Sequence, residues 1–276
     1  MNLVVQGGVL AREALAELVA LARAVQTVPL GNTAWRLIGA RPAGQIEQWC
    51  AGRRLDCAWV PENRRLADLR LVAMDMDSTL VTIESIDEMG DLLGIREKIA
   101  AVTEQAMRGE IDYPESLRRR VALLAGLEEQ SLEKICEERM HLSPGAESLV
   151  RRCRDAGIRT LLVSGGFSFF TAWLQRRLGI DQTLSNVLEI DRGRLTGRVV
   201  GGIVDGAAKA DRLRAEIARL GVARAHTVAI GDGANDIPMM AAAGVSIAYR
   251  AKPVVREHAT HALDHSGLDG VLNLFV

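Results

Sequence analysis

Short apolar runs and stretches of helical periodicity follow one another over the first 69 residues. The apolar runs predict strands and the periodic stretches predict helices. The predicted strands are 3–6, 35–38 and 57–60, and the predicted helices are 12–24 and 45–51. We therefore expect a small N-terminal α/β unit over residues 1–68, which ends in a polar linker stretch at 61–65.

The pattern changes after residue 68. Leu69–Met76 is an apolar run that predicts a buried strand ending in acidic residues. Residues 83–140 are then charged, with helical periodicity and no strong strand signal. We expect a helical cap, at about 84–142, inserted after the first strand of a larger domain that spans 69–276.

Regular alternation of strands and helices returns beyond Ser143-Pro144-Gly145. The predicted helices are 146–156, 169–178, 209–220 and 237–243, and the predicted strands are 158–163, 182–187, 227–230 and 245–248. The segment 187–200 alternates around Asp191-Arg192-Gly193 and predicts a β-hairpin. Strands separated by helices predict an α/β fold with a doubly wound parallel sheet, in which ligands bind at the carboxyl ends of the strands.

Composition excludes several classes of partner. The chain has 276 residues, with 34 Lys and Arg against 35 Asp and Glu, so no overall field favours nucleic acid or a membrane surface. Charged residues interrupt the apolar residues near the N-terminus, and no apolar segment is long enough to span a bilayer. We expect a soluble cytoplasmic protein without nucleic-acid or membrane partners, and a homodimer is left open.

Cysteine and histidine give no convincing site. The cysteines lack C-x-x-C spacing and are interpreted as reduced packing thiols. The histidines near the end of the chain, His258, His261 and His265, are interpreted as polar surface residues rather than zinc ligands.

Two carboxylates two residues apart, Asp75 and Asp77, stand where the predicted strand 69–76 stops. Taken alone, they fit an Asp-rich turn. Desolvating two like charges side by side is costly without a cation, so the pair also fits a metal site or separate acid and base roles.

The next strand ends in Ser164-Gly165-Gly166, where glycines let backbone amides approach an anion closely. Lys209 lies at the start of a predicted helix, where the helix dipole does not favour a cation. An ordinary turn and a solvated lysine explain these two features separately. A phosphate site explains them together.

A third strand ends in Gly231-Asp232-Gly233-Ala234-Asn235-Asp236. Asn235 or Asp236 could cap the following helix. All these polar residues share the carboxyl edge of one predicted sheet. A nucleophilic Asp, a second acid, a hydroxyl with backbone donors, a lysine and a metal-binding Asp are the groups needed for phosphoryl transfer through an aspartyl-phosphate.

The sequences D-M-D-S-T-L, V-S-G-G, the isolated Lys209 and G-D-G-A-N-D resemble the four motifs of the haloacid-dehalogenase-like phosphatases, over about 69–276. Within that superfamily, Glu84, the run from Met107 through Tyr113 to Arg120 and the closing A-K-P resemble the phosphoserine phosphatase family. The resemblance implies Mg²⁺-dependent hydrolysis of O-phosphoserine, a small phosphorylated amino acid, as the last step of serine biosynthesis.

The resemblance also implies roles for the acidic residues. Asp75 would attack phosphorus, and Asp77 would donate a proton to the leaving oxygen and later accept one from water. Mg²⁺ would be held by Asp75, the backbone carbonyl of Asp77 and Asp232. Asp236 would orient Lys209 or the metal waters from behind.

Further roles implied by the resemblance concern the substrate. Ser164, the Gly165 amide and Lys209 would bind the phosphoryl oxygens. Glu84 would bind the substrate ammonium and Arg120 its carboxylate.

Three more residues are expected around the substrate. Met107 and Tyr113 would form an apolar wall, and Asn235 would contact the substrate. Tyr113 stands where Phe is common in the family. Without the other motifs, Met107 would be read as helix core and Arg120 as part of a solvated face.

Three alternatives remain open at this point. The same residues could transfer the phosphoryl group to an alcohol such as homoserine, or act on another small phosphometabolite. A catalytically silent binding protein is a third, in which residues 1–68, weakly similar to an ACT-type regulatory domain, bind a ligand.

Overall fold

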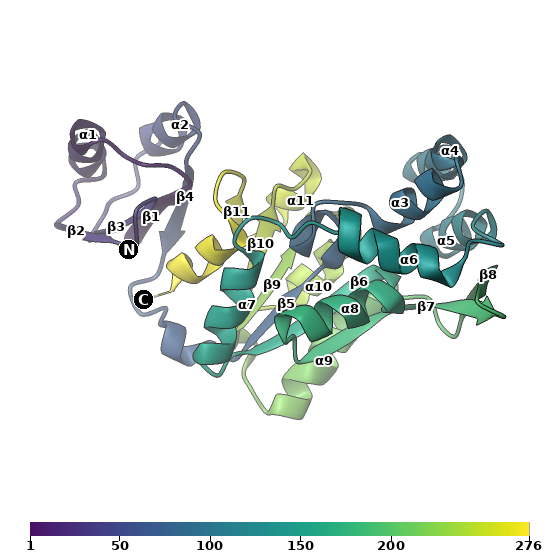
Figure 1. The fold of residues 1–276 in the computed structure, drawn as a ribbon. Helices are drawn as coiled ribbons and strands as arrows, with labels where there is room; N and C mark the ends of the chain where they lie inside the picture. The colour runs from purple at the N-terminus through teal and green to yellow at the C-terminus, as the bar shows by residue number, and fades with distance from the viewer. Residues whose placement is uncertain (276) are drawn as a thin grey trace.

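The computed structural model of the protein describes residues 1–275, which form two separate β-sheets with their helices (Figure 1). The N-terminal sheet is antiparallel and has the strand order β2-β3-β1-β4. Its elements are β1 (Asn2–Gln6), α1 (Arg12–Ala22), β2 (Gln26–Pro29), β3 (Ala34–Ile38), α2 (Gln45–Ala51) and β4 (Asp56–Val60). Strand β2 was not predicted, because this edge strand is largely exposed and shows no apolar alternation.

Both faces of the N-terminal sheet are covered, which explains why β1 is buried along its whole length. Leu3 and Val5 pack with residues of α1 and α2. Val4, which points to the opposite face, packs in the core that includes Val271 and Phe275 near the end of the chain. Figure 1 shows the C-terminal segment, in yellow, beside β4.

The larger sheet has the order β11-β10-β9-β5-β6-β7-β8 and is parallel except for the β7–β8 pair. Its strands are β5 (Leu71–Met74), β6 (Arg159–Phe167), β7 (Gln182–Asp191), β8 (Arg194–Val200), β9 (Thr227–Gly231), β10 (Val245–Tyr249) and β11 (His261–Leu263). The central strand β5 lies between β6 and β9, so their carboxyl ends meet at one edge.

Helices cover both faces of this sheet. Val72 and Met74 of β5 share a core with α7 (Ala146–Asp155) and α8 (Ser168–Leu178). Leu71 and Ala73 face the other way, toward α9 (Gly206–Leu220), α10 (Ile237–Ala242) and α11 (Pro253–Glu257). The predicted doubly wound α/β fold is confirmed.

Between β5 and β6 the chain forms a group of helices at the carboxyl edge of the sheet (Figure 1). These are α3 (Ser85–Leu92), α4 (Arg96–Met107), α5 (Tyr113–Ala122) and α6 (Glu129–Lys134), and a π-turn (Ile135–Arg139) follows them. The predicted β7–β8 hairpin is confirmed, with Asp191 opposite Arg194. Its strand β8 packs against α5, and a bridge joins Arg194 to Glu128. The sequence did not predict that this hairpin supports the helical group.

The interpretation of His261, near the C-terminal end of the described residues, was wrong. His261 was interpreted as a polar surface residue, but it lies partly buried in β11 and pairs with β10. Its Nε2 is 2.7 Å from Nη1 of Arg64. A three-residue strand gives too short a signal to be recognised in sequence. Among residues 1–275, no helix has the length and apolar character required to cross a membrane.

Candidate active site

Strand β5 delivers Asp75 to the carboxyl edge of the sheet. The four strand residues are buried, and the Asp75 N–H continues the sheet pairing by donating to the carbonyl of Ile230 at 3.0 Å. The Asp75 Oδ1 accepts from the Met76 N–H at 2.7 Å and lies 2.8 Å from Nζ of Lys209. Both contacts involve Oδ1 of Asp75. The other carboxylate oxygen, Oδ2, therefore remains available to a ligand.

Lys209 is completely buried beside Asp75 and Asp236. The side chain of Asp205 caps α9 by accepting from the Ala208 N–H at 2.9 Å, which fixes the first turn that carries the lysine. Burial lowers the pKa of Lys209, but the carboxylates of Asp236 and Asp75 outweigh this effect and leave the pKa above its ordinary value. The lysine is therefore a permanent ammonium.

Asp236 is also completely buried and links this ammonium to the loop after β9. Its Oδ1 is 2.7 Å from Nζ of Lys209, and its Oδ2 accepts from the N–H groups of Asp232 at 3.2 Å and Gly233 at 3.0 Å. Asp236 thus fixes both the lysine and the backbone that carries Asp232.

The carboxylates of Asp75, Asp232 and Asp236 each place an oxygen within 4.8 Å of the others. Burial raises the pKa of Asp75 well above its ordinary value, and Asp236 adds to this rise. Burial also raises the pKa of Asp232 to about 6. A hydrogen bond that the Thr79 hydroxyl donates to Asp232 Oδ1 at 2.7 Å opposes this rise. The three carboxylates exceed the charge of Lys209, and hard oxygen donors suit a hard divalent cation. The residues present therefore fit such an ion.

Asp77 occupies a different environment from Asp75. Its two oxygens accept from the backbone N–H of Ser85 at 3.1 Å and from the Ser85 hydroxyl at 3.0 Å. Burial raises the pKa of Asp77 to about 7, and the charge of Glu84 acts in the same direction, whereas Ser85 opposes it. A carboxyl group with this pKa can give and take a proton near neutral pH.

The end of β6 brings the Ser164-Gly165 segment under the helical group. Ser164 is buried, and its Oγ accepts from the Gly166 N–H at 2.8 Å. The Gly165 carbonyl accepts from the hydroxyl of Tyr113 on α5 at 3.2 Å and from Nδ2 of Asn186 at 2.7 Å. A Cβ on Gly165 would lie 2.3 Å from that hydroxyl, so only glycine permits this approach.

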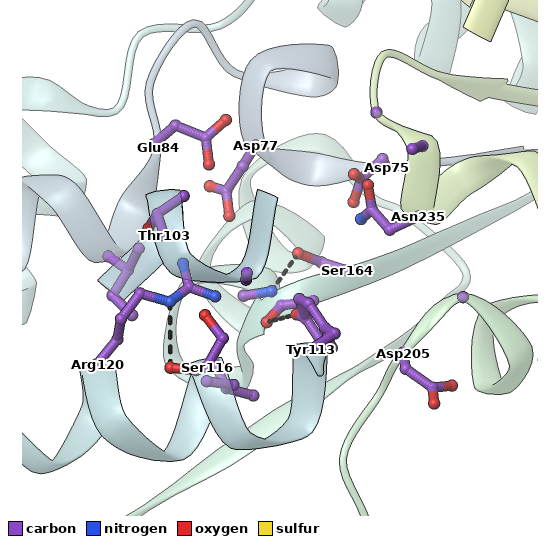
Figure 2. A pocket seen from close by; sticks show the side chains of 18 of the residues that line it. Asp75, Asp77, Glu84, Thr103, Tyr113, Ser116, Arg120, Ser164, Asp205 and Asn235 are labelled. Carbon is purple, nitrogen blue, oxygen red and sulfur yellow. Dashed lines mark hydrogen bonds between the residues drawn. The ribbon is translucent and has the colours of Figure 1, made fainter. Parts of the chain in front are cut away.

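A cavity of about 860 Å³ lies between the edge of the sheet and the helical group. Figure 2 shows Glu84 and Asp77 on one side of it, Arg120 on another, and Asp75 with Asn235 on a third. The Arg120 Nε donates to the carbonyl of Ser116 at 3.4 Å, which directs the guanidinium along α5.

All predicted site residues except Lys209 and Asp236, which are both completely buried, line this cavity. Lys209 lies buried behind Asp75 rather than on the cavity surface. Met107 lies at the rim with 72% of its surface exposed, so its interpretation as ordinary helix core is wrong.

Thr79, Ser85 and Asn186 are site residues that the sequence did not single out. Thr79 stands inside the quoted D-M-D-S-T-L motif, so its position offered a signal. Ser85 follows Glu84, but a serine at a helix start is ordinarily a cap. Asn186 accepts from the Val204 N–H at 2.8 Å and so joins β7, the Gly165 segment and the approach to α9. No local pattern marks such a long-range bridge.

A family model described as haloacid dehalogenase-like hydrolase matches residues 72–241. The chain belongs to this family. The matched range contains the acidic, hydroxyl and lysine residues described above. A second model, a domain of unknown function (DUF4072), matches residues 3–45.

Several curated relatives of this hydrolase are named phosphoserine phosphatase. This chain is 53% identical over 216 residues to the phosphoserine phosphatase of Albidiferax ferrireducens. The alignment covers 76% of this chain and 91% of that protein. The structure of a probable phosphoserine phosphatase from Vibrio cholerae superposes with a TM-score of 0.88 at 36% identity, covering 99% of this chain and 85% of that one. A structure described as a phospho-aspartyl intermediate analogue of phosphoserine phosphatase matches with a TM-score of 0.70 at 36% identity, covering 75% and 99%.

Proposed function

We propose that this hydrolase is a phosphoserine phosphatase, which converts O-phosphoserine to serine and phosphate through an aspartyl-phosphate on Asp75. The observation that carries the proposal is the composition of the cavity. Asp75, held by Lys209, lies at its base, and an acidic and a basic side chain, Glu84 and Arg120, lie on its walls. This pair complements the ammonium and the carboxylate of an amino acid.

The first step is attack of Asp75 Oδ2 on phosphorus, which breaks the bond between phosphorus and the serine oxygen. Protonated Asp77 donates its proton to that oxygen, so serine leaves as the alcohol. In the second step water attacks phosphorus and gives a proton to Asp77. The aspartyl-phosphate bond breaks, Asp75 is regenerated as a carboxylate, and phosphate leaves.

Charge on the transferring group is balanced by groups of the chain itself. The Ser164 hydroxyl and the Gly165 N–H supply hydrogen bonds to phosphoryl oxygens. Lys209 balances charge from behind Asp75, while Asp236 keeps the ammonium in place.

Asp75 and Asp232, together with the backbone carbonyl of Asp77, are the groups that would hold Mg²⁺. When bound, the ion neutralises the carboxylates and polarises the phosphoryl group. Asp236, which is already bonded to Lys209 and two backbone N–H groups, supports this set from behind.

Three further lining residues, Tyr113, Asn235 and Met107, contribute to substrate selection. Tyr113 closes the cavity over the Gly165 carbonyl, Asn235 contacts the substrate beside Asp75, and Met107 shields the rim. Transfer to an alcohol acceptor such as homoserine is the second candidate, because the aspartyl-phosphate can react with water or with a hydroxyl group.

The catalytic machinery belongs to one part of the chain. We assign residues 1–68 to a separate N-terminal unit and 69–276 to the phosphatase domain, with the cap at about 84–142. None of the residues that line the cavity comes from 1–68, so the N-terminal unit acts on the reaction only through the catalytic domain.

The test is phosphate release from phosphoserine, phosphothreonine and sugar phosphates, with Mg²⁺ and with EDTA. Phosphoserine is expected to be the preferred substrate, and EDTA is expected to abolish turnover. A sugar phosphate that outperforms phosphoserine would refute the substrate, and formation of phosphohomoserine after adding homoserine would identify a transferase. Asp75→Asn is expected to lower turnover by at least about a thousandfold with an unchanged circular dichroism spectrum.

Arg120→Gln tests the substrate carboxylate contact and has a matched control on the same helix. It is expected to raise KM for phosphoserine by about tenfold or more, since a charged hydrogen bond is worth about 1.5–3 kcal/mol. Arg119→Gln removes an exposed neighbour that pairs with Glu115 and should leave KM unchanged. Equal KM values for the two variants would remove Arg120 from the site.

A further inference from the structure

A second cavity, of about 650 Å³, lies between the N-terminal sheet and the larger sheet. Arginines from both parts of the chain line it. Arg53 and Arg54 follow α2, while Arg250 follows β10 and Arg256 lies in α11. It shares no residue with the lining of the catalytic cavity.

Two of these arginines form ion pairs with acidic side chains. Arg256 pairs with the carboxylate of Asp264, with 2.6 Å from Nη2 to Oδ1, and its Nε donates to the carbonyl of Ala251 at 3.0 Å. Arg53 lies 3.2 Å from Glu17 and 4.0 Å above the ring of Trp49.

Arg54 and Arg250 are the other two arginines that line the cavity. Neither has an ion pair within the part of the chain that the structure describes, and Asp264 is the acidic residue on the cavity wall. The cavity therefore carries a surplus of positive charge, with one uncompensated guanidinium on each side of the boundary between the two sheets.

Buried contacts join the two walls of the cavity and fix their relative position. Asp56 of β4 accepts from the N–H groups of Asp264 at 2.8 Å and Ser266 at 2.8 Å, and from the Ser266 hydroxyl at 2.6 Å. Gly7, with φ +103°, approaches His265 so closely that a Cβ would lie 2.9 Å from the Cβ of His265. The cavity is thus a preformed feature of the boundary.

We propose that this cavity is a binding site for a small phosphorylated molecule with a diphosphate or similarly charged group. Planar guanidinium groups match phosphate oxygens in pairs, and the volume lies within the roughly 300–1,000 Å³ of small-molecule sites. Arg54 and Arg250 also adopt left-handed backbone conformations, with φ values of 55° and 46°, as residues at binding sites often do. A ligand that contacts both sides stabilises the docking of the N-terminal sheet on the catalytic domain.

Inorganic pyrophosphate is the probe, titrated calorimetrically into the full chain in EDTA. Without a divalent cation the catalytic cavity, rich in carboxylates, repels the probe. We expect one pyrophosphate per chain and at least tenfold weaker binding for the double variant Arg54→Ser, Arg250→Ser. A second titration uses adenosine diphosphate in place of pyrophosphate. Tighter binding of adenosine diphosphate indicates a nucleotide ligand, and tighter binding of pyrophosphate indicates an inorganic one. Either result supports the site.

The matched control is Arg12→Ser, Arg151→Ser, which removes the same charge from exposed arginines elsewhere. It is expected to bind pyrophosphate within about twofold of the wild type. Phosphoserine turnover without pyrophosphate is expected to be the same for all three proteins, which verifies folding. Arg54→Ser alone answers the question if the double variant does not fold. Equal binding by wild type and Arg54 variants, or no binding by wild type, would overturn the proposal.

Discussion

The partly buried side chain of His261 is expected to make the free energy of unfolding depend on pH. Its Nε2 lies 2.7 Å from Arg64, and because a guanidinium can only donate, this nitrogen accepts and the ring is neutral. Burial lowers the pKa of His261 from 6.5 to about 4, and the charge of Arg64 acts in the same direction. Protonation would remove the hydrogen bond and bring two cations together.

The size of the effect follows from linkage. The folded pKa lies below the unfolded value of 6.5, so the unfolded chain binds the proton first as pH falls. The stability that the neutral ring contributes is complete above 6.5 and is lost as pH falls toward 4, where the loss reaches about 3 kcal/mol. At about pH 5 the loss is about 2 kcal/mol.

The assay is urea unfolding of the wild type, His261→Gln and His258→Gln at about pH 7.5 and about pH 5. The difference in unfolding free energy between these two conditions is expected to be about 2 kcal/mol smaller for His261→Gln than for the wild type. His258→Gln, which changes an exposed ring of the same tail, is the control. The reasoning fails if His261→Gln keeps the wild-type difference between the two conditions.

Three further predictions concern turnover of phosphoserine. Because leaving-group protonation requires protonated Asp77, whose pKa burial raises to about 7, kcat/KM is expected to fall as pH rises through about 7; a profile flat to about pH 9 would exclude this acid. Ser85→Ala removes a hydrogen bond that lowers the pKa of Asp77, so the falling limb should move up by about one pH unit; an unmoved or lowered limb contradicts the contact. Tyr113→Phe removes the bond to Gly165 and should raise KM about fivefold without changing the secondary structure; an unchanged KM would show that this bond does not hold the cap closed.

Much of the fold was predictable because strand ends carry their own signal. Leu71–Met74 is continuously apolar and is followed by Asp75, a combination that indicates a buried strand ending at a site. The same logic located Ser164 and Asp232. Once those strands are placed in one parallel sheet, their carboxyl ends must meet, so the sequence order already implied that these residues converge.

Other features depend on contacts that local patterns do not encode. The packing of β8 on α5 and the bridge made by Asn186 join segments whose relation appears only after folding. The exposed strand β2 lacks alternation, and its pairing with β3 is a tertiary effect on a weak propensity. Burial of His261 likewise arises from the approach of Arg64, which is 197 positions away.

The contact between Asp56 and the loop that begins at Asp264 spans 208 positions, which has a consequence for synthesis. At ribosomal rates the N-terminal sheet emerges on the order of 10 to 40 seconds before that loop. During this interval the face of Val4 lacks the cover that Val271 and Phe275 later provide. The nascent sheet therefore carries an exposed apolar surface throughout this interval, and a ribosome-associated chaperone has a defined segment to shield until Val271 and Phe275 have been synthesised.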